Sequence, residues 1–105
     1  MAGIGMTSEK KWFAAKWILF YLLEIVKDKF PKGSILDIAI EAGLNDGTNW
    51  LNLQEVPFNQ LDLFKREIKL IYDDLKQKGA SSLASPEFYP GLMERISELV
   101  ELLEE

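Results

Sequence analysis

The chain has 105 residues, with seventeen Asp and Glu against twelve Lys and Arg, a formal net charge of −5, and neither His nor Cys. Without Cys, disulfides, thiolate nucleophiles, zinc fingers and iron–sulfur clusters are excluded. Without His, the Ser-His-Asp and Cys-His types of catalysis and His-ligated metals are excluded as well. The apolar fraction of 48% is enough to build one core at this length.

The domain organisation predicted from the sequence is simple. Residues 1–7 are rich in glycine and weakly patterned, so we expect a disordered N-terminal segment or a remnant of cloning. Residues 8–105 are expected to form a single helical domain. The longest uncharged apolar run, Trp17 to Leu23, is far shorter than the roughly 20 residues that a bilayer requires. We therefore expect a cytoplasmic protein without a membrane partner.

The first predicted helix spans residues 9–30, with Ser8 as its cap and Pro31 just after its end. At about 100° per residue, one apolar face is the expected core face; it contains Trp12, Ala15, Leu19, Leu22, Val26 and Phe30. The opposite face contains Phe13, Trp17, Phe20 and Tyr21. This second face packs against other helices, is left for a partner chain, or lies on a membrane surface. Because Trp and Tyr are favoured interface anchors, we take these four residues as the candidate protein interface.

The second predicted helix is Ile35 to Ala42. Ser34 followed by Asp37 is typical of a capped helix start, and Gly43 is typical of the position after a helix end. A turn follows at residues 45–47, and a short helix is expected from Thr48 or Asn49 to Leu53.

Two further helices complete the predicted fold. Asn59 caps a long helix that ends at Gly79, with apolar residues recurring at three and four. After a loop, Pro86 and Pro90 open the last helix. With no convincing strand, the predicted fold class is all-α, a compact bundle of four to five helices.

One segment matches a known sequence pattern. Ile38-Ala39, Ala42-Gly43-Leu44 and Gly47-Thr48 occur in the register of that pattern, and Trp50 takes its first aromatic position, while Leu53 replaces the second aromatic. On these residues, the segment from Phe30 to Leu53 resembles the helix-turn-helix of the tetracycline-repressor (TetR) family. The resemblance implies a helix-turn-helix-like corner and DNA contacts from polar side chains around the turn, for which the candidates are Asn45, Thr48, Asn49 and Asn52.

The distribution of charge disfavours DNA as the partner. Net charge is +3 over residues 1–32, −5 over 33–64, +2 over 65–78 and −5 over 79–105. DNA affinity comes largely from Lys and Arg that meet phosphates. Residues 33–64 contain no Lys or Arg, so the segment that would read DNA lacks the necessary cations.

The last helix is strongly acidic, with Arg95 its only basic residue; its acidic residues are Glu94, Glu98, Glu101, Glu104 and Glu105. This face is either solvated or faces a basic partner, and the adjacent apolar seam packs in the core or at a homodimer contact. No phosphate-binding loop, dinucleotide fingerprint or EF-hand occurs, so we expect no enzyme activity, cofactor or metal.

These observations predict a non-enzymatic, small, acidic, helical protein-protein interaction module, such as an adaptor, an accessory subunit or an immunity-type protein. The expected partner is a protein, for which a basic surface would suit the acidic helix, and homo-oligomerisation is left open. The alternative is a helix-turn-helix DNA-binding or transcription-regulatory protein.

Overall fold

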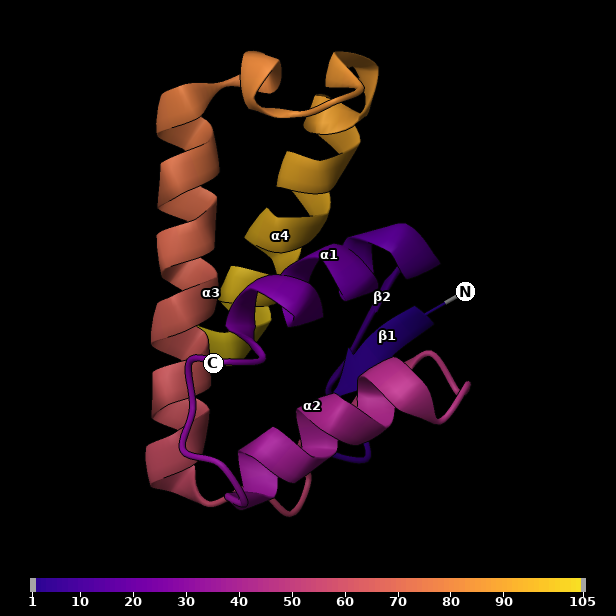
Figure 1. Ribbon diagram of the computed structural model, residues 1–105, viewed down its shortest axis with the longest axis vertical. Helices are drawn as coiled ribbons and strands as arrows, with labels where there is room; N and C mark the ends of the chain where they lie inside the picture. The colour runs from indigo at the N-terminus through magenta and orange to yellow at the C-terminus, as the bar shows by residue number, and fades with distance from the viewer. Residues whose placement is uncertain (1, 105) are drawn as a thin grey trace. The chain divides into compact units, whose positions relative to one another are not determined.

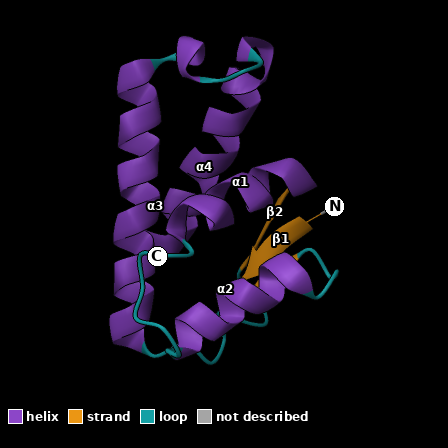
Figure 2. Ribbon diagram, viewed as in Figure 1, coloured by secondary structure: helices purple, strands orange, loops and turns teal. Residues whose placement is uncertain are grey.

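The computed structural model describes residues 2–104, which form helices and a small sheet (Figures 1 and 2). In chain order the elements are β1 (Ala2–Gly5), β2 (Lys11–Ala14), α1 (Lys16–Val26), α2 (Ile35–Asn45), β3 (Trp50–Asn52), α3 (Phe58–Lys78), the short 3₁₀ helices η1 (Ala80–Ser82) and η2 (Pro86–Phe88), and α4 (Tyr89–Glu104). The chain divides into two compact units, Met1–Phe64 and Lys65–Glu105.

The prediction of an all-α bundle is wrong, because the first unit contains a three-stranded mixed sheet. The strand order is β2-β1-β3, with β1 antiparallel to β2 and parallel to β3. We expected residues 1–7 to be disordered, but Ala2–Gly5 form the buried central strand. Alternating Ala, Gly, Ile and Gly carry little strand signal on their own, and their conformation depends on two partner strands elsewhere in the chain.

The first helix is shorter than predicted, because Lys11–Ala14 form a strand. Along β2, exposed and buried residues alternate, which is the period of a half-buried strand. The helix α1 begins at Lys16 after Ala15, which makes no side-chain capping bond, so Ser8 is not its cap. Trp12 is buried as predicted, but from a strand and not from the first turn of a helix.

The predicted start of α2 is confirmed. Ser34 precedes the helix, and its Oγ accepts a hydrogen bond from the Asp37 N–H at 3.2 Å. The helix continues past Gly43 to Asn45, so Gly43 is not the residue after its end. A Cβ at Gly43 would lie 3.3 Å from Leu23 Cδ1 and 3.4 Å from the Trp50 carbonyl oxygen. Glycine therefore lets α2 lie close to the backbone of β3.

The helix-turn-helix-like corner is not formed. Where a short helix was predicted after the turn, Trp50–Asn52 form β3, which pairs with β1. Of the residues that match the TetR pattern, Gly43 lies close to β3, whereas Ile38 and Ala42 are exposed on the other side of α2. A sequence match at such positions does not decide between the two arrangements.

The core of the first unit lies on one face of the sheet. Ile4, Trp12 and Leu51 are fully or almost fully buried and come from the three strands, one from each. The helices α1 and α2 contribute further large buried side chains to this core, among them Leu19, Leu22, Leu23, Leu36 and Ile40. Contacts join α1 to β1 and α2 to β3. The opposite face of the sheet carries different residues, described below.

The second unit consists of the part of α3 from Lys65, the two 3₁₀ helices and α4. The predicted long helix is present with bounds Phe58–Lys78, so Asn59 lies inside the helix and is not its cap. The Tyr89 Oη donates to the Leu75 carbonyl at 3.0 Å, and Lys69 Nζ lies 3.8 Å from Glu104 Oε1, so α3 and α4 run antiparallel. Their buried side chains are Ile68, Ile71, Leu75, Leu92, Ile96 and Leu99. Within residues 2–104, no helix is long and apolar enough to cross a membrane.

Candidate protein-binding surface

The outer face of the sheet has no side chains on its central strand. Gly3 and Gly5 alternate with Ala2 and Ile4 along β1 and so point to the outer face. In register with these glycines stand Phe13 and Lys11 of β2 and Trp50 and Asn52 of β3. Residues opposite each other on paired strands share a face, so these six residues form the outer face.

Aromatic rings occupy the space above the two glycines. A Cβ at Gly3 would lie 2.7 Å from Trp50 Cζ3, and a Cβ at Gly5 would lie 2.9 Å from Trp50 Cζ2. The indole of Trp50 therefore lies directly on the central strand. The Phe13 ring stands 5.7 Å from the Trp50 ring, centroid to centroid, at an interplanar angle of 50°. Phe13 is 48% exposed and Trp50 is half-buried, so the pair leaves an aromatic surface, formed mainly by Phe13, open to solvent.

The strand β2 is an edge of this sheet, because in the described residues it pairs only with β1. In an antiparallel pair, every second residue turns its N–H and C=O toward the neighbouring strand. The Met6 N–H donates to the Lys10 carbonyl at 2.9 Å, in the same register, which places Trp12 and Ala14 among the residues that bond to β1. Lys11 and Phe13 therefore turn their N–H and C=O toward the free edge.

Cations lie beside this aromatic surface. Lys11 and Lys16 are exposed, one on β2 and one at the start of α1. The Lys16 Nζ stands 5.3 Å from the centroid of the Phe20 ring, which is a cation–π distance. Residues 1–32, which include both lysines, carry six basic and three acidic groups.

The four residues predicted as a protein interface do not share one helix face. Phe13 lies on β2, whereas Trp17, Phe20 and Tyr21 lie on α1. Phe13 and Trp17 are exposed, and Phe20 and Tyr21 are half-buried. Trp50 was not predicted as part of this surface. The sequence signal for the position of Trp50 was the alternation of Gly3 and Gly5. A central strand with no side chains on one face leaves room there for a large side chain from a neighbouring strand.

The residues predicted to contact DNA lie on three different elements. Asn45 is the last residue of α2, Thr48 and Asn49 lie in the following turn, and Asn52 is on β3. The Asn45 Nδ2 donates to the Glu41 carbonyl at 2.9 Å and to Glu41 Oε2 at 3.3 Å. These side chains do not project together from one recognition helix.

The turn after α2 is held by local hydrogen bonds. The Thr48 Oγ1 donates to Asp46 Oδ1 at 2.7 Å, and the Thr48 N–H donates to the same oxygen at 2.9 Å. These two bonds, the backbone bond first, lower the pKa of Asp46 below its usual value. Asn52 Oδ1 accepts from the Gln54 N–H at 2.9 Å. Three of the predicted DNA contacts, Asn45, Thr48 and Asn52, thus serve bonds within the fold.

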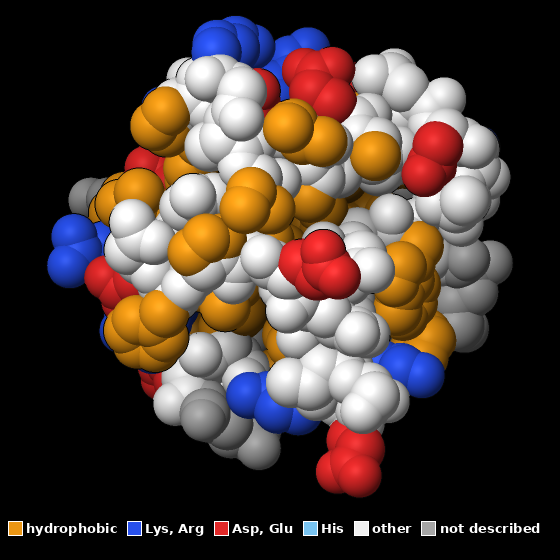
Figure 3. Space-filling model, turned by 90° about the horizontal axis from the view of Figure 1, so that it is seen from below, with side chains coloured by type: hydrophobic (Ala, Val, Ile, Leu, Met, Phe, Trp, Pro, Cys, Tyr) orange, Lys and Arg blue, Asp and Glu red, His pale blue; other side chains and the backbone are white. Residues whose placement is uncertain are grey.

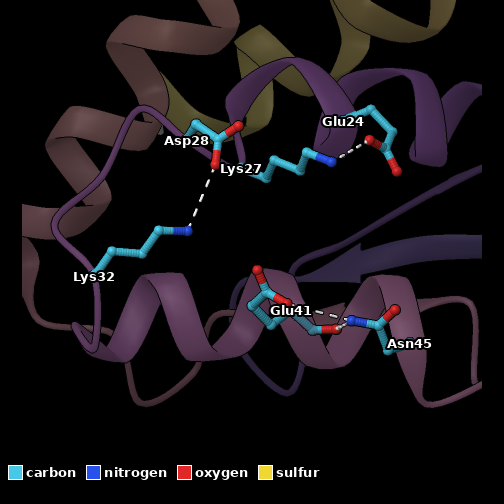
Figure 4. A network of polar contacts seen from close by, with 6 residues as sticks. All are labelled: Glu24, Lys27, Asp28, Lys32, Glu41 and Asn45. Atoms are coloured by element: carbon cyan, nitrogen blue, oxygen red, sulfur yellow. Dashed lines mark hydrogen bonds and ion pairs between the residues drawn. The ribbon is translucent and has the colours of Figure 1, made fainter.

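Basic side chains near α2 are paired with acids (Figure 4). The Lys27 Nζ lies 2.8 Å from Glu24 Oε2, and Lys32 Nζ lies 3.5 Å from Asp28 Oδ1. The hydrogen bond that Lys27 Nζ donates to Glu24 is the main cause that raises the pKa of Lys27. Both pairs are exposed and contribute little to stability, but they keep these two cations with acidic groups of the same segment.

Neither metal binding nor similarity to known proteins adds a second candidate. Within residues 2–104, no group of three or more acidic side chains is placed to hold a metal ion. Comparison of the chain with protein-family models, curated proteins and solved structures found no match. The aromatic surface and the adjoining edge of β2 are therefore the candidate site, on geometry alone.

Proposed function

We propose that this protein is a binding module that takes an extended segment of a protein partner at the free edge of β2. The observation that carries this proposal is the position of the exposed Phe13 ring, in contact with the half-buried Trp50, on an edge strand whose alternate backbone groups point outward. Strand addition is a recurring mode of peptide recognition, with backbone hydrogen bonds for affinity and side-chain contacts for selection.

In this proposal the backbone edge, the Phe13 ring and the lysines each have a separate role in binding the partner strand. The N–H and C=O groups of Lys11 and Phe13 would form the ladder with the added strand. Every second side chain of the partner would lie on the outer face of the sheet, beside the Phe13 ring. Lys11 and Lys16 would favour acidic side chains in the partner and speed its association.

DNA binding by the segment from Asn45 to Asn52 has less support as a function. That segment contains a turn and a strand in place of a recognition helix. It also lies within the 32 residues that carry five acidic groups and no cation. Phosphate contacts, which supply most of the affinity for DNA, would have to come from elsewhere.

The test selects binders from a display library of random linear peptides on the immobilised full chain and measures their affinity by fluorescence anisotropy. Phe13→Ala should weaken the selected peptides by about tenfold or more, as expected for an aromatic anchor. The matched control is Phe88→Ala, since Phe88 is exposed to a similar extent but lies in η2 of the second unit. A labelled DNA duplex, titrated at two salt concentrations, tests the alternative.

Hydrogen exchange shows whether a selected peptide uses the edge. In the free protein, the amides of Lys11 and Phe13 should exchange much faster than the bonded amides of Trp12 and Ala14. Bound peptide should slow the first two selectively. Tight binding that leaves the Lys11 and Phe13 amides unprotected, or that survives Phe13→Ala, would refute strand addition.

A further inference from the structure

The free edge of β2 is short, because other structure begins at both of its ends. Before the strand, hydrogen bonds from two backbone N–H groups to Thr7 Oγ1, at 3.2 and 2.8 Å, hold a bend over residues 7–10. After the strand, the Ala15 carbonyl accepts two N–H groups of α1, at 3.0 and 3.3 Å. Lys11 and Phe13 are therefore the residues of β2 whose backbone groups an added strand can use.

So short an edge favours antiparallel addition. In an antiparallel pair, two residues of the added strand would exchange all four hydrogen bonds with Lys11 and Phe13, and only three partner residues would have to be ordered. In a parallel pair, each edge residue bonds to the residues before and after the one opposite it, so the same four bonds require five partner residues. Because each ordered residue costs conformational entropy, the antiparallel arrangement is the better use of this edge.

Antiparallel pairing determines which partner side chains meet which residues of β2. The partner residues opposite Phe13 and Lys11 would lie with those two side chains on the outer face of the sheet. The residue between them would be opposite Trp12 and point to the inner face, where Trp12 is almost fully buried, so a small side chain is expected there. Because the two strands run in opposite directions, the residue opposite Phe13 comes first in the partner's sequence.

The two outer positions offer different chemistry to the partner. An apolar or aromatic side chain opposite Phe13 would cover the exposed part of its ring. Lys11 is exposed on the same face two residues earlier, so an acidic side chain suits the position opposite it. The other nearby cation, Lys16, lies on α1, where its Nζ is 5.3 Å from the centroid of the Phe20 ring. Lys11 is therefore the cation that an added strand would meet directly.

Selection by a single lysine agrees with the distribution of charge. On the face shown in Figure 3, acidic and basic side chains are scattered among hydrophobic ones and do not gather into one charged area. Of the three acidic residues within residues 1–32, Glu24 and Asp28 pair with lysines other than Lys11, and Glu9 lies in the bend before β2. A partner is thus selected by individual side-chain pairs and not by a broad charged area.

We propose that the β2 edge selects an antiparallel strand in which an apolar or aromatic residue is followed, two residues later, by Asp or Glu. The residue between these two is small. Phe13 determines the preference at the apolar position, and Lys11 determines the preference at the acidic one. This inference rests on the proposed function, because it concerns the same edge and adds the direction of the partner strand and the order of its residues.

Two peptides of identical composition test the order of residues. They are Ser-Thr-Tyr-Ala-Glu-Thr-Ser and its reverse, Ser-Thr-Glu-Ala-Tyr-Thr-Ser, both blocked at their ends and titrated at millimolar concentration into the isotope-labelled full chain, with amide NMR as the readout. The first should bind about fivefold more tightly, because the reverse peptide can place both side chains correctly only as a parallel strand. A spin label at the N-terminus of the first peptide should broaden the Ala14 amide more than the Glu9 amide, as the antiparallel direction requires.

Charge reversal tests the role of Lys11. Lys11→Glu should weaken the first peptide by about fivefold, and a version of that peptide with Lys in place of Glu should bind this variant more tightly than it binds the wild-type chain. The matched control is Lys10→Glu, which changes the net charge equally at the preceding residue, where alternation directs the side chain to the other face. This control should leave the preference unchanged, and circular dichroism checks that each variant is folded.

The outcomes separate this inference from the proposed function. Equal binding of the two peptides, a parallel direction, or equal effects of Lys10→Glu and Lys11→Glu would overturn the inference, while protection of the Lys11 and Phe13 amides would still support strand addition. If neither peptide protects those amides, the inference fails, and the library selection described above decides whether the proposed function fails with it.

Discussion

The first unit carries two exposed apolar surfaces that differ in every property relevant to binding. The sheet surface consists of aromatic rings beside an edge strand with outward backbone groups, among the cations Lys11 and Lys16. On α2, the exposed Ile35, Ile38 and Ala42 form an aliphatic stripe, the α2 stripe, and the backbone bonds there are used within the helix. Only the first surface offers backbone groups to an added strand.

This difference shows why the net charge of −5 describes neither surface. Along the chain, blocks of opposite sign alternate, with a net charge of +3 over residues 1–32 and −5 over residues 33–64. A partner within about a Debye length of one surface interacts with the charges at that surface and not with the net charge of the whole protein. The predictions below separate the folding role of each region from its binding role.

The largest expected effect separates two adjacent residues of β2. Trp12→Ala removes a buried indole from the core and should lower the free energy of unfolding by about 3–5 kcal/mol. Phe13→Ala, at an exposed position, should lower it by less than about 1 kcal/mol. Urea unfolding followed by circular dichroism measures both. Equal losses would mean that Phe13 belongs to the core and that the sheet surface is not free to bind.

A smaller effect is expected from a side chain on the central strand. In Gly3→Ala the new Cβ would clash with the Trp12 carbonyl and lie 2.7 Å from the Trp50 ring, so we expect a loss of about 1–3 kcal/mol. The control is Gly91→Ala in α4, where nothing lies within 4 Å. Because Ala is the better helix former, this control should be neutral or stabilising by up to about 1 kcal/mol. Chemical unfolding of the two variants should thus give results of opposite sign, and a harmless Gly3→Ala would contradict the close position of Trp50.

The capping of α2 provides the next prediction. Ser34→Ala removes the acceptor for the Asp37 N–H and should cost about 1 kcal/mol, with faster amide exchange in the first turn of α2. Ser81→Ala is the comparison, since its hydroxyl makes a long 3.5 Å bond at an exposed site. If the two variants melt at the same temperature, the cap contributes nothing to the helix that presents the α2 stripe.

The smallest effect concerns the acidic side of α2. Thr48→Val removes the hydroxyl bond to Asp46 but keeps the backbone bond, so the pKa of Asp46 should rise only part of the way to its ordinary value. Since the folded pKa is lowered, the hydrogen-bonded carboxylate contributes stability above the unfolded pKa, and this is lost as the pH falls through the folded pKa. Carboxyl NMR titration measures the shift. An unchanged pKa would assign the effect to the backbone bond alone.

The sequence predicted the helices whose signals are local and missed every strand. Ser34 and Asp37 are three residues apart, so the start of α2 is readable from neighbouring residues, and the long apolar repeat of α3 is likewise local. The strands β1 and β3 pair across more than forty residues of chain. Residues 11–14 fit both the helical and the strand period, and only pairing with β1 decides between them.

The candidate site was predicted in part for the same reason. Phe13 and Trp17 stood out as aromatic residues on a face that the core does not need, and both are exposed. Trp50 was instead assigned to a helical corner through its match to a sequence pattern. Its contact with Gly3 and Gly5 depends on a register that the order of residues in the chain does not reveal.

The two glycines on the outer face of β1 also bear on how such a surface can change during evolution or design. Because strand residues alternate between faces, substitutions at positions 13 and 50 alter the outer rings while Trp12 and Leu51 keep the core. The central strand contributes only backbone to that face, so it imposes no side-chain preference of its own on what binds there. Ligand choice would thereby be concentrated in the flanking strands, at Lys11 and Phe13 of β2 and at Trp50 and Asn52 of β3. A small library varied at Phe13 and Trp50 would sample new specificities.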